Sequence, residues 1–313
     1  MKSVSVRIGS LDLKNPVIAA PAEHLILEEG IVAAIRSGAG AVVGKSTNES
    51  DAAKAQLLQA EYTLLDSDWN PVPWNGDAGR PVTFLNRSGL SPFPWEQWLE
   101  NAIRCEALAV SHDCLFVPSI ILSDIDHAVK MAREIEAAGF RVLELNIGTP
   151  YGKIAQAGAV STEQLGARVE EIVRTVASSV SIPVWTKITG QSDKVSNLAS
   201  SAFKGSAAAV VMPGRQLGMV PDLETMAPVL GTSCGVGGFW NLPMTCHWLA
   251  NTREAVGQGK PLIATNGARD GHDALRMILA GASGVAMASE VMLRGVSVLT
   301  EAIGQIQQGH ESL

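Results

Sequence analysis

The chain has 313 residues, a formal net charge of −7 at pH 7 and a pI near 5.4. Hydrophobic residues make up 46% of the chain, so it can build a large core. The acidic balance argues against a nucleic-acid-binding protein, because such a protein needs a basic stripe to meet the phosphates.

Short apolar runs alternate with segments of helical period along most of the chain. The runs predict strands, and their near-continuous apolarity is typical of parallel strands buried on both faces. The predicted strands are residues 16–20, 40–45, 114–120, 141–147, 183–188, 207–212, 261–265 and 284–288. The predicted helices are residues 27–37, 95–110, 124–138, 162–178, 194–203, 243–256, 271–280 and 290–307. Eight such units favour a closed (β/α)8 TIM barrel of the α/β class over an open sheet.

Two segments depart from this alternation. Residues 1–15 predict a short hairpin that closes the bottom of the barrel. Residues 46–94 form a long insertion after the second predicted strand and contain Trp69, Trp74 and several prolines. Insertions at this end of a barrel strand commonly form an active-site roof or an interface. No linker divides the chain, so residues 1–313 are expected to form one domain.

Cysteines and apolar segments limit the cofactors and the location. The four cysteines form no Cys-x-x-Cys pair, so we expect neither an iron–sulfur cluster nor a zinc site. The N-terminal residues lack the apolar core of a signal peptide. No uninterrupted run of about 18 apolar residues occurs, which is the length a membrane span needs. We therefore expect a cytoplasmic protein that does not cross a membrane.

The C-terminal third carries a pattern typical of phosphate binding. Residues 263–271 follow the seventh predicted strand, and residues 285–290 end the eighth. Barrels often bind a phosphate with these two loops and a helix N-terminus. Gly267 allows close backbone approach, and N–H groups near Ala288 and Ser289 are candidate donors. Gly237 and Gly238 offer further donors from the preceding loop. The alternative is that these glycines only form turns.

Two lysines lie at the C-terminal ends of predicted strands. Lys45 ends the second strand and Lys187 lies in the fifth. A lysine inside a barrel is costly to bury without an anionic or polar partner. We therefore interpret both lysines as site residues.

Two asparagines lie in similar positions. Asn146 is in the run Glu-Leu-Asn-Ile-Gly-Thr-Pro-Tyr-Gly at the tip of the fourth strand, three residues before Thr149. Asn86 is in the run Phe-Leu-Asn-Arg-Ser-Gly-Leu. Their amides suit a cyclic amide or imide, because an amide can pair with both N–H and C=O groups. The alternative is that each asparagine only caps a turn.

Together these motifs resemble the dihydroorotate and dihydropyrimidine dehydrogenases. Residues 144–152 are similar to the catalytic loop of that family, and residues 261–283 to its FMN phosphate segment. The resemblance extends from Asn15 to the last helix and implies a barrel that binds FMN. It places Lys187 near flavin N1 and O2, and Lys45 near the O4 edge and the substrate. The cofactor-binding residues it implies are Ala20, Pro21, Lys45, Ser46, Asn146, Lys187, Gly237, Gly238, Asn266, Gly267, Ala288 and Ser289.

The chain departs from the family pattern at several positions. Thr149 stands where the family carries Cys or Ser, and Tyr151 where it carries Asn or His. The family's asparagine at the end of strand six falls at about Met212. A hydroxyl is a weaker acid than a thiol and needs an adjacent base, for which Lys153, Tyr151 and His24 are candidates. Arg215 either clamps a carboxylate or lies on the surface.

These observations predict an FMN-dependent oxidoreductase. It would transfer a hydride between flavin N5 and a CH–CH or C=C bond of a small, cyclic polar substrate such as a dihydropyrimidine or dihydroorotate. Thr149, Lys45 and Lys187 are the expected catalytic residues; Asn86, Asn146 and Tyr151 are expected to bind the substrate. The alternatives are a Schiff-base lyase or aldolase that uses Lys187 on a phosphorylated substrate, and a non-catalytic flavin electron-transfer subunit. The resemblance also implies a homodimer and, as in some relatives, an electron-transfer partner subunit.

Overall fold

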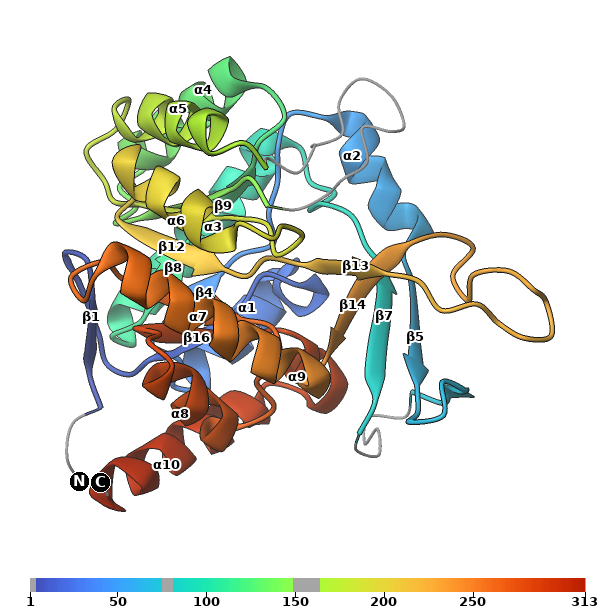
Figure 1. Cartoon of the computed structure of the whole chain (residues 1–313). Helices are drawn as coiled ribbons and strands as arrows, with labels where there is room; N and C mark the ends of the chain where they lie inside the picture. The colour runs from blue at the N-terminus through green and yellow to red at the C-terminus, as the bar shows by residue number, and fades with distance from the viewer. Residues whose placement is uncertain (1–3, 75–80, 149–163, 313) are drawn as a thin grey trace.

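A computed structural model of the chain arranges the predicted strands in one ring of parallel strands (Figure 1). It describes residues 4–74, 81–148 and 164–312. The ring contains, in spatial order, β8 (Leu115–Val117), β4 (Ala41–Val43), β3 (Val17–Ala19), β16 (Gly284–Met287), β15 (Leu262–Thr265), β12 (Ala209–Met212), β11 (Val184–Lys187), β10 (Leu143–Asn146) and β9 (Ser119–Ile121). Neighbours in the ring follow one another along the chain, as in a (β/α)8 barrel. The predicted fold class is confirmed.

The ring closes at a proline. β8 and β9 are the two halves of the predicted third strand, and Pro118 lies between them. β8 pairs with β4, whereas β9 pairs with β10 on the other side. Proline has no N–H to give to a ladder, but the Pro118 carbonyl still accepts a 2.8 Å hydrogen bond from the Glu144 N–H. The third strand therefore joins both of its neighbours despite the interruption.

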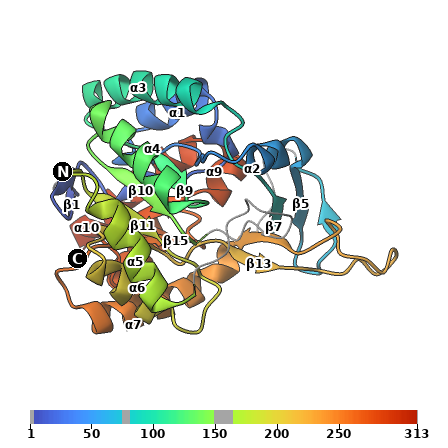
Figure 2. The same cartoon turned by 90° about the horizontal axis from the view of Figure 1, so that it is seen from above.

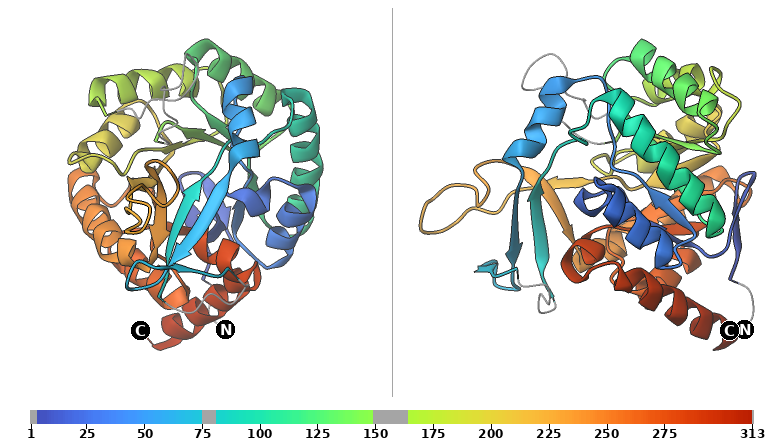
Figure 3. Two further views of the ribbon diagram at one scale, coloured as in Figure 1. Left: turned by 90° about the vertical axis from the view of Figure 1, so that its right-hand side faces the viewer. Right: turned by 180° about the vertical axis from the view of Figure 1, so that it is seen from behind.

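Helices cover the outside of the ring (Figure 3, left). They are α1 (Glu28–Arg36), α3 (Trp95–Ser111), α4 (Ile125–Ala137), α5 (Gly166–Ala177), α6 (Val195–Lys204), α7 (Leu242–Val256), α8 (Gly271–Leu279), α9 (Ser289–Arg294) and α10 (Ser297–Ser312). The Asp124 side chain caps α4 by accepting from two backbone N–H groups. The last predicted helix is in fact two helices, because Gly295 ends α9 with φ +84. No described helix is long and apolar enough to cross a bilayer.

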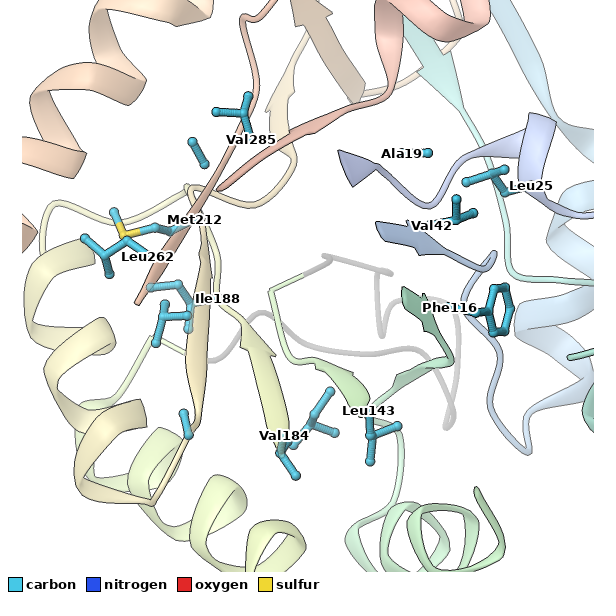
Figure 4. Close-up of a cluster of buried hydrophobic side chains, with 14 of the residues drawn as sticks. Ala19, Leu25, Val42, Phe116, Leu143, Val184, Ile188, Met212, Leu262 and Val285 are labelled. Atoms are coloured by element: carbon cyan, nitrogen blue, oxygen red, sulfur yellow. The ribbon is translucent and has the colours of Figure 1, made fainter. Parts of the chain in front are cut away.

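Strand side chains alternate between an outer and an inner layer of the core. The outer layer lies between strands and helices, and Figure 4 shows part of it, including Val42, Leu143 and Met212. The inner layer fills the barrel and includes Val43 and Trp185. This alternation follows from the two-residue period of a strand. It determines which side chains can face a site at the end of the barrel.

The N-terminal hairpin closes one end of the barrel, as predicted. Its strands are β1 (Val6–Ile8) and β2 (Leu11–Leu13), which pair antiparallel. Ile8 and Leu13 are buried in the inner layer together with the barrel side chains. The hairpin therefore seals the N-terminal end of the strands and leaves the other end free for chemistry.

A second sheet stands over the C-terminal end of the strands (Figures 1 and 2). It consists of β13 (Gln216–Gly218), β14 (Cys234–Gly238), β7 (Thr83–Arg87), β5 (Glu61–Leu65) and β6 (Pro71–Val72), all antiparallel. The insertion after β4 supplies β5, β6, β7 and the short helix α2 (Asp51–Ala55), whereas the segment after β12 supplies β13 and β14. The sheet therefore joins two distant insertions into one roof.

Candidate functional site

A cavity of about 110 Å³ lies between the barrel and the roof sheet. Predicted site residues line much of it, namely Ala20, Pro21, Lys45, Ser46, Asn86, Asn146, Lys187, Gly237, Asn266, Ala288 and Ser289. Glu23, Phe84 and Arg215 are further lining residues. Residues that are dispersed along the sequence thus share one space.

A smaller cavity of about 30 Å³ adjoins the first. It contains the two remaining described candidates, Gly238 and Gly267, and shares Asn266, Ala288 and Ser289 with the larger cavity. Thr149 and Tyr151 lie outside the described residues, as does Lys153. The roles predicted for these three residues stay predictions.

Strand alternation explains why polar side chains meet at this end of the barrel. The side chains of Val43, Glu144 and Trp185 lie on the inward faces of their strands and are buried. Two residues further along the same faces come Lys45, Asn146 and Lys187. The strands are parallel, so their C-terminal ends lie together. The site is therefore the continuation of the inner layer, with polar residues in place of apolar ones.

Lys45 is paired with a carboxylate that sequence reasoning missed. Its Nζ lies 2.9 Å from Oε1 of Glu23 and 3.0 Å from Oγ of Ser88, and Ser88 also donates to Glu23. Burial raises the pKa of Glu23, but the Lys45 ammonium and the hydrogen bonds from Ser88 and Lys45 lower it to about 2. Burial lowers the pKa of Lys45 against the opposing charge of Glu23. Glu23 directly follows Pro21-Ala22 after the first strand, so its position at the barrel mouth was the available signal.

Lys187 begins a second buried polar chain. Its Nζ lies 3.7 Å from Oε1 of Glu144, which is 1% exposed and accepts from Ser119 at 2.7 Å. The Ser119 and Ser46 oxygens are also 2.7 Å apart. Because Ser119 gives its proton to Glu144, Ser46 must be the donor to Ser119. Ser46 therefore presents only lone pairs to the cavity, where it can accept a hydrogen bond from a ligand.

The two asparagines face the cavity from opposite walls. Asn146 belongs to the barrel, and its Oδ1 accepts from the Gly148 N–H at 3.1 Å. Asn86 belongs to the roof, and its Nδ2 donates to the Gly235 carbonyl at 3.2 Å. A backbone bond orients each amide, and an amide side chain carries two donors and two acceptor positions in all. A flat polar ring between the two walls would meet both.

In the loop at the phosphate end, the Asn266 side chain bonds to a neighbouring loop of the protein. Asn266 has φ +70, and its Nδ2 donates to the carbonyls of Pro213 and Gly214 at 3.0 and 2.7 Å. Its side chain therefore ties two loops together. Gly267, with φ +107, approaches α7 so closely that a Cβ would lie 2.5 Å from the Leu242 nitrogen. Glycine is required there for both reasons.

The residues at this end fit the predicted phosphate of FMN. A Cβ on Gly237 would lie 2.5 Å from Oγ of Ser289, so the missing side chain leaves the hydroxyl and backbone N–H groups open to a ligand. Arg269 lines the smaller cavity, where Asp273 holds it at 2.7 Å. Anion-compatible groups thus lie at one end of the space, and the two lysines at the other. This arrangement suits an elongated cofactor with a phosphate and a polar ring.

Met212 ends the sixth barrel strand, where the resemblance aligned it with the family's asparagine. It is 0% exposed and packs in the outer layer, because Val211 is the inward residue of that pair (Figure 4). The chain then turns at Pro213, and Arg215 lines the cavity instead. Met212 therefore supplies no polar contact to the cavity, and Arg215 is the residue of this segment that lines it.

His24 is a partly buried residue outside the cavity lining, with both ring nitrogens shielded from solvent. Neither ring nitrogen has a hydrogen-bond partner among the described residues, and burial lowers its pKa to about 4. The unfolded chain has a His pKa of about 6.5. Between pH 6.5 and about 4 the unfolded state binds a proton at His24 that the folded state does not bind. Stability therefore falls as the pH drops through this interval.

Wild-type protein should therefore lose up to about 3 kcal/mol of stability over this interval through His24. Denaturant titrations at pH 6.5 and 4.5 would measure the loss. The variant His24→Phe keeps a ring without a titrating group and should lose less stability than wild type. Glu23 acts only at lower pH, because its contribution is lost between about 4.5 and 2. Equal losses in wild type and variant would contradict the assignment to His24.

Comparison with known proteins agrees with this geometry. The family model described as "Dihydroorotate dehydrogenase" matches residues 62–309. The dihydroorotate dehydrogenase A (fumarate) of Lactobacillus delbrueckii subsp. bulgaricus is 27% identical over 92% of this chain and 88% of that protein. The catalytic subunit of dihydroorotate dehydrogenase B (NAD(+)) of Thermoplasma acidophilum is 26% identical over 98% of this chain and 93% of its own length. The corresponding subunit of Methanosarcina mazei is 28% identical over 94% and 86%.

Proposed function

The chain belongs to the dihydroorotate dehydrogenase family, whose members are FMN-dependent oxidoreductases acting on CH–CH groups, and we propose that its substrate is a small cyclic amide of the dihydropyrimidine type. The observation that carries this proposal is the meeting of Lys45, Lys187, Asn86 and Asn146 in one cavity that continues into a phosphate-compatible end. An elongated cofactor and a ring substrate would both find partners there.

Residues at both ends of the cavity support FMN as the cofactor. Gly237, Gly267 and Ser289 would receive the phosphate, and Lys187 with Ser46 would hold the ring. FMN, when bound, supplies the hydride acceptor or donor at its N5 atom. Lys187 would place positive charge near the ring, where negative charge develops on reduction. Glu144 fixes Lys187 in that position through the 3.7 Å ion pair.

The substrate would lie between the two asparagines. Asn86 and Asn146 would orient it by pairing with its N–H and C=O groups. We further propose that Thr149 moves the proton at the substrate carbon; it follows directly after Gly148 and lies outside the described residues. A hydroxyl needs a base or a water relay for this task. Among the described residues, His24 does not line the cavity.

Family membership favours the oxidoreductase over the two alternatives. A Schiff-base lyase would need Lys187 as a free amine, whereas Lys187 lies beside the buried carboxylate of Glu144. A non-catalytic flavin subunit would not need two amides on opposite walls of the substrate space. We also propose that the protein forms a homodimer and passes its electrons to an acceptor outside this chain, such as a partner subunit.

Purified protein should be yellow and should release FMN on denaturation. Under anaerobic conditions, dihydroorotate or dihydrouracil should bleach the flavin absorbance, because the ring accepts the hydride. Absorbance spectra before and after each addition measure this directly. A colourless protein that takes up no added FMN would contradict the cofactor. A yellow protein that neither compound bleaches would contradict only the substrate class.

A further inference from the structure

Arg215 lines the main cavity without a partner from the protein. No hydrogen bond or ion pair joins its guanidinium to any residue within 4–74, 81–148 or 164–312. Its charge nevertheless acts on both Glu23 and Lys45, which places it at their end of the cavity. An arginine has five N–H donors in a planar fork. Here that fork points into a space that a ligand would fill.

The backbone around Arg215 is fastened on both sides. Asn266 donates to the carbonyls of Pro213 and Gly214, and Gln216 donates to the Gly190 carbonyl at 3.3 Å. Gly214 itself packs so closely that a Cβ would lie 2.4 Å from the Ile188 carbonyl oxygen. These contacts fix the direction in which the Arg215 side chain leaves the loop.

Gly235 makes room for the side chain. A Cβ on Gly235 would lie 2.9 Å from Cδ and 3.1 Å from Nε of Arg215, and 2.7 Å from Oδ1 of Asn86. Arg215 therefore lies across the bare backbone of β14, next to the Asn86 amide. Gly235 also pairs with Asn86 in the sheet register. The roof thus presents an amide and a guanidinium side by side.

The other cations at this end already have counter-ions. Lys45 lies 2.9 Å from Glu23, and Lys187 lies 3.7 Å from Glu144. Arg215 is the lining cation that is left without a carboxylate among the described residues. A positive charge in a partly enclosed space favours an anionic ligand, and a guanidinium matches a carboxylate with two parallel hydrogen bonds.

We propose that Arg215 binds a carboxylate of the substrate and thereby selects an anionic ring over a neutral one. This inference rests on the proposed function, since it places the substrate ring beside Asn86. Lys45 is not the carboxylate-binding group here, because Glu23 and Ser88 already hold its ammonium. Substrate specificity would then depend on Arg215, in the connection between β12 and β13, and on Gly235, whose lack of a side chain leaves room for it.

Orotate and uracil provide a matched pair of probes, because they differ by one carboxylate. Their binding to the FMN-loaded protein can be followed by flavin difference spectra. Wild type should bind orotate about ten- to a hundredfold more tightly than uracil, the scale of a charge-assisted hydrogen bond. Arg215→Met should remove this preference and leave uracil binding within about threefold. Gly235→Ala should weaken orotate binding because its Cβ displaces the arginine, and it should weaken uracil binding as well because the same Cβ would lie 2.7 Å from Oδ1 of Asn86.

Arg87→Met is the control variant. Arg87 belongs to the same sheet but does not line the cavity, and it pairs with Glu61 at 3.4 Å. It should keep the wild-type preference for orotate. FMN content, measured in every variant, separates the two proposals: colourless protein contradicts the proposed function. Yellow wild-type protein that prefers uracil, binds the two equally or binds no orotate overturns the role of Arg215, as does an Arg215→Met variant that keeps the preference.

Discussion

Replacing Lys45 by methionine should destabilise the protein by about 3–5 kcal/mol, the usual cost of leaving a buried charge without its partner. Lys45 is 6% exposed, and its ammonium is held by Glu23 and Ser88. Methionine fills similar space but leaves the Glu23 carboxylate without a cation at bonding distance. Denaturant titration of wild type and variant near neutral pH would measure the difference in the free energy of unfolding.

The double variant Lys45→Met/Glu23→Gln tests the cause. It removes both charges, so it should recover most of the stability that the single variant loses. Lys130→Met is the matched surface control: Lys130 is 71% exposed and lies 3.8 Å from Glu134, so its loss should cost less than about 1 kcal/mol. A double variant as unstable as the single one would show that packing, and not the ion pair, explains the effect.

The barrel could be predicted because each strand repeats the same local pattern. Apolar runs such as residues 207–212 fill both faces of a strand, and amphipathic segments separate them. The two lysines could be predicted for the opposite reason, since each interrupts an apolar run at its end. A lysine is costly to bury, so its place at the end of a buried strand indicates a site even when its counter-ion is unknown.

The partners were not predictable from local pattern. Glu23 meets Lys45 from another loop. Ser119 joins Glu144 to Ser46 only because β9 lies between β10 and the segment that follows β4. The roof is a stronger case, because Asn86 bonds to Gly235 across 149 positions of sequence. Long-range pairing of two irregular insertions leaves little periodic signal in either segment.

The outward direction of Met212 has a local cause. Strand alternation places Ala209 and Val211 inside the barrel, so Met212 must point outward. The chain turns after Met212, and this turn brings Arg215 into the lining of the cavity. The two-residue period of the strand is visible in the sequence and is sufficient to assign Met212 to the outer layer.

Gly148→Ala should cost about 3 kcal/mol of stability and abolish bleaching of the flavin by substrate. A Cβ at this position would lie 2.2 Å from the Ile188 carbonyl carbon and 2.4 Å from the Thr189 nitrogen. Backbone cannot rotate away as a side chain can, so β10 and β11 would have to separate. That shift would move Asn146, whose Oδ1 accepts from the Gly148 N–H, and would redirect the chain that leads to Thr149.

Two further variants separate backbone placement from chemistry. Gly304→Ala lies in α10 with nothing near its new Cβ, so it should stabilise the protein by about 0.5–1 kcal/mol. Thr149→Val replaces the hydroxyl by a methyl group of similar size and should slow bleaching without the loss of stability. Unfolding titrations and anaerobic bleaching rates on all three variants would measure both effects. If Gly148→Ala were as stable as wild type and bleached at the same rate, the close contact between the two strand ends would not control the geometry of the site.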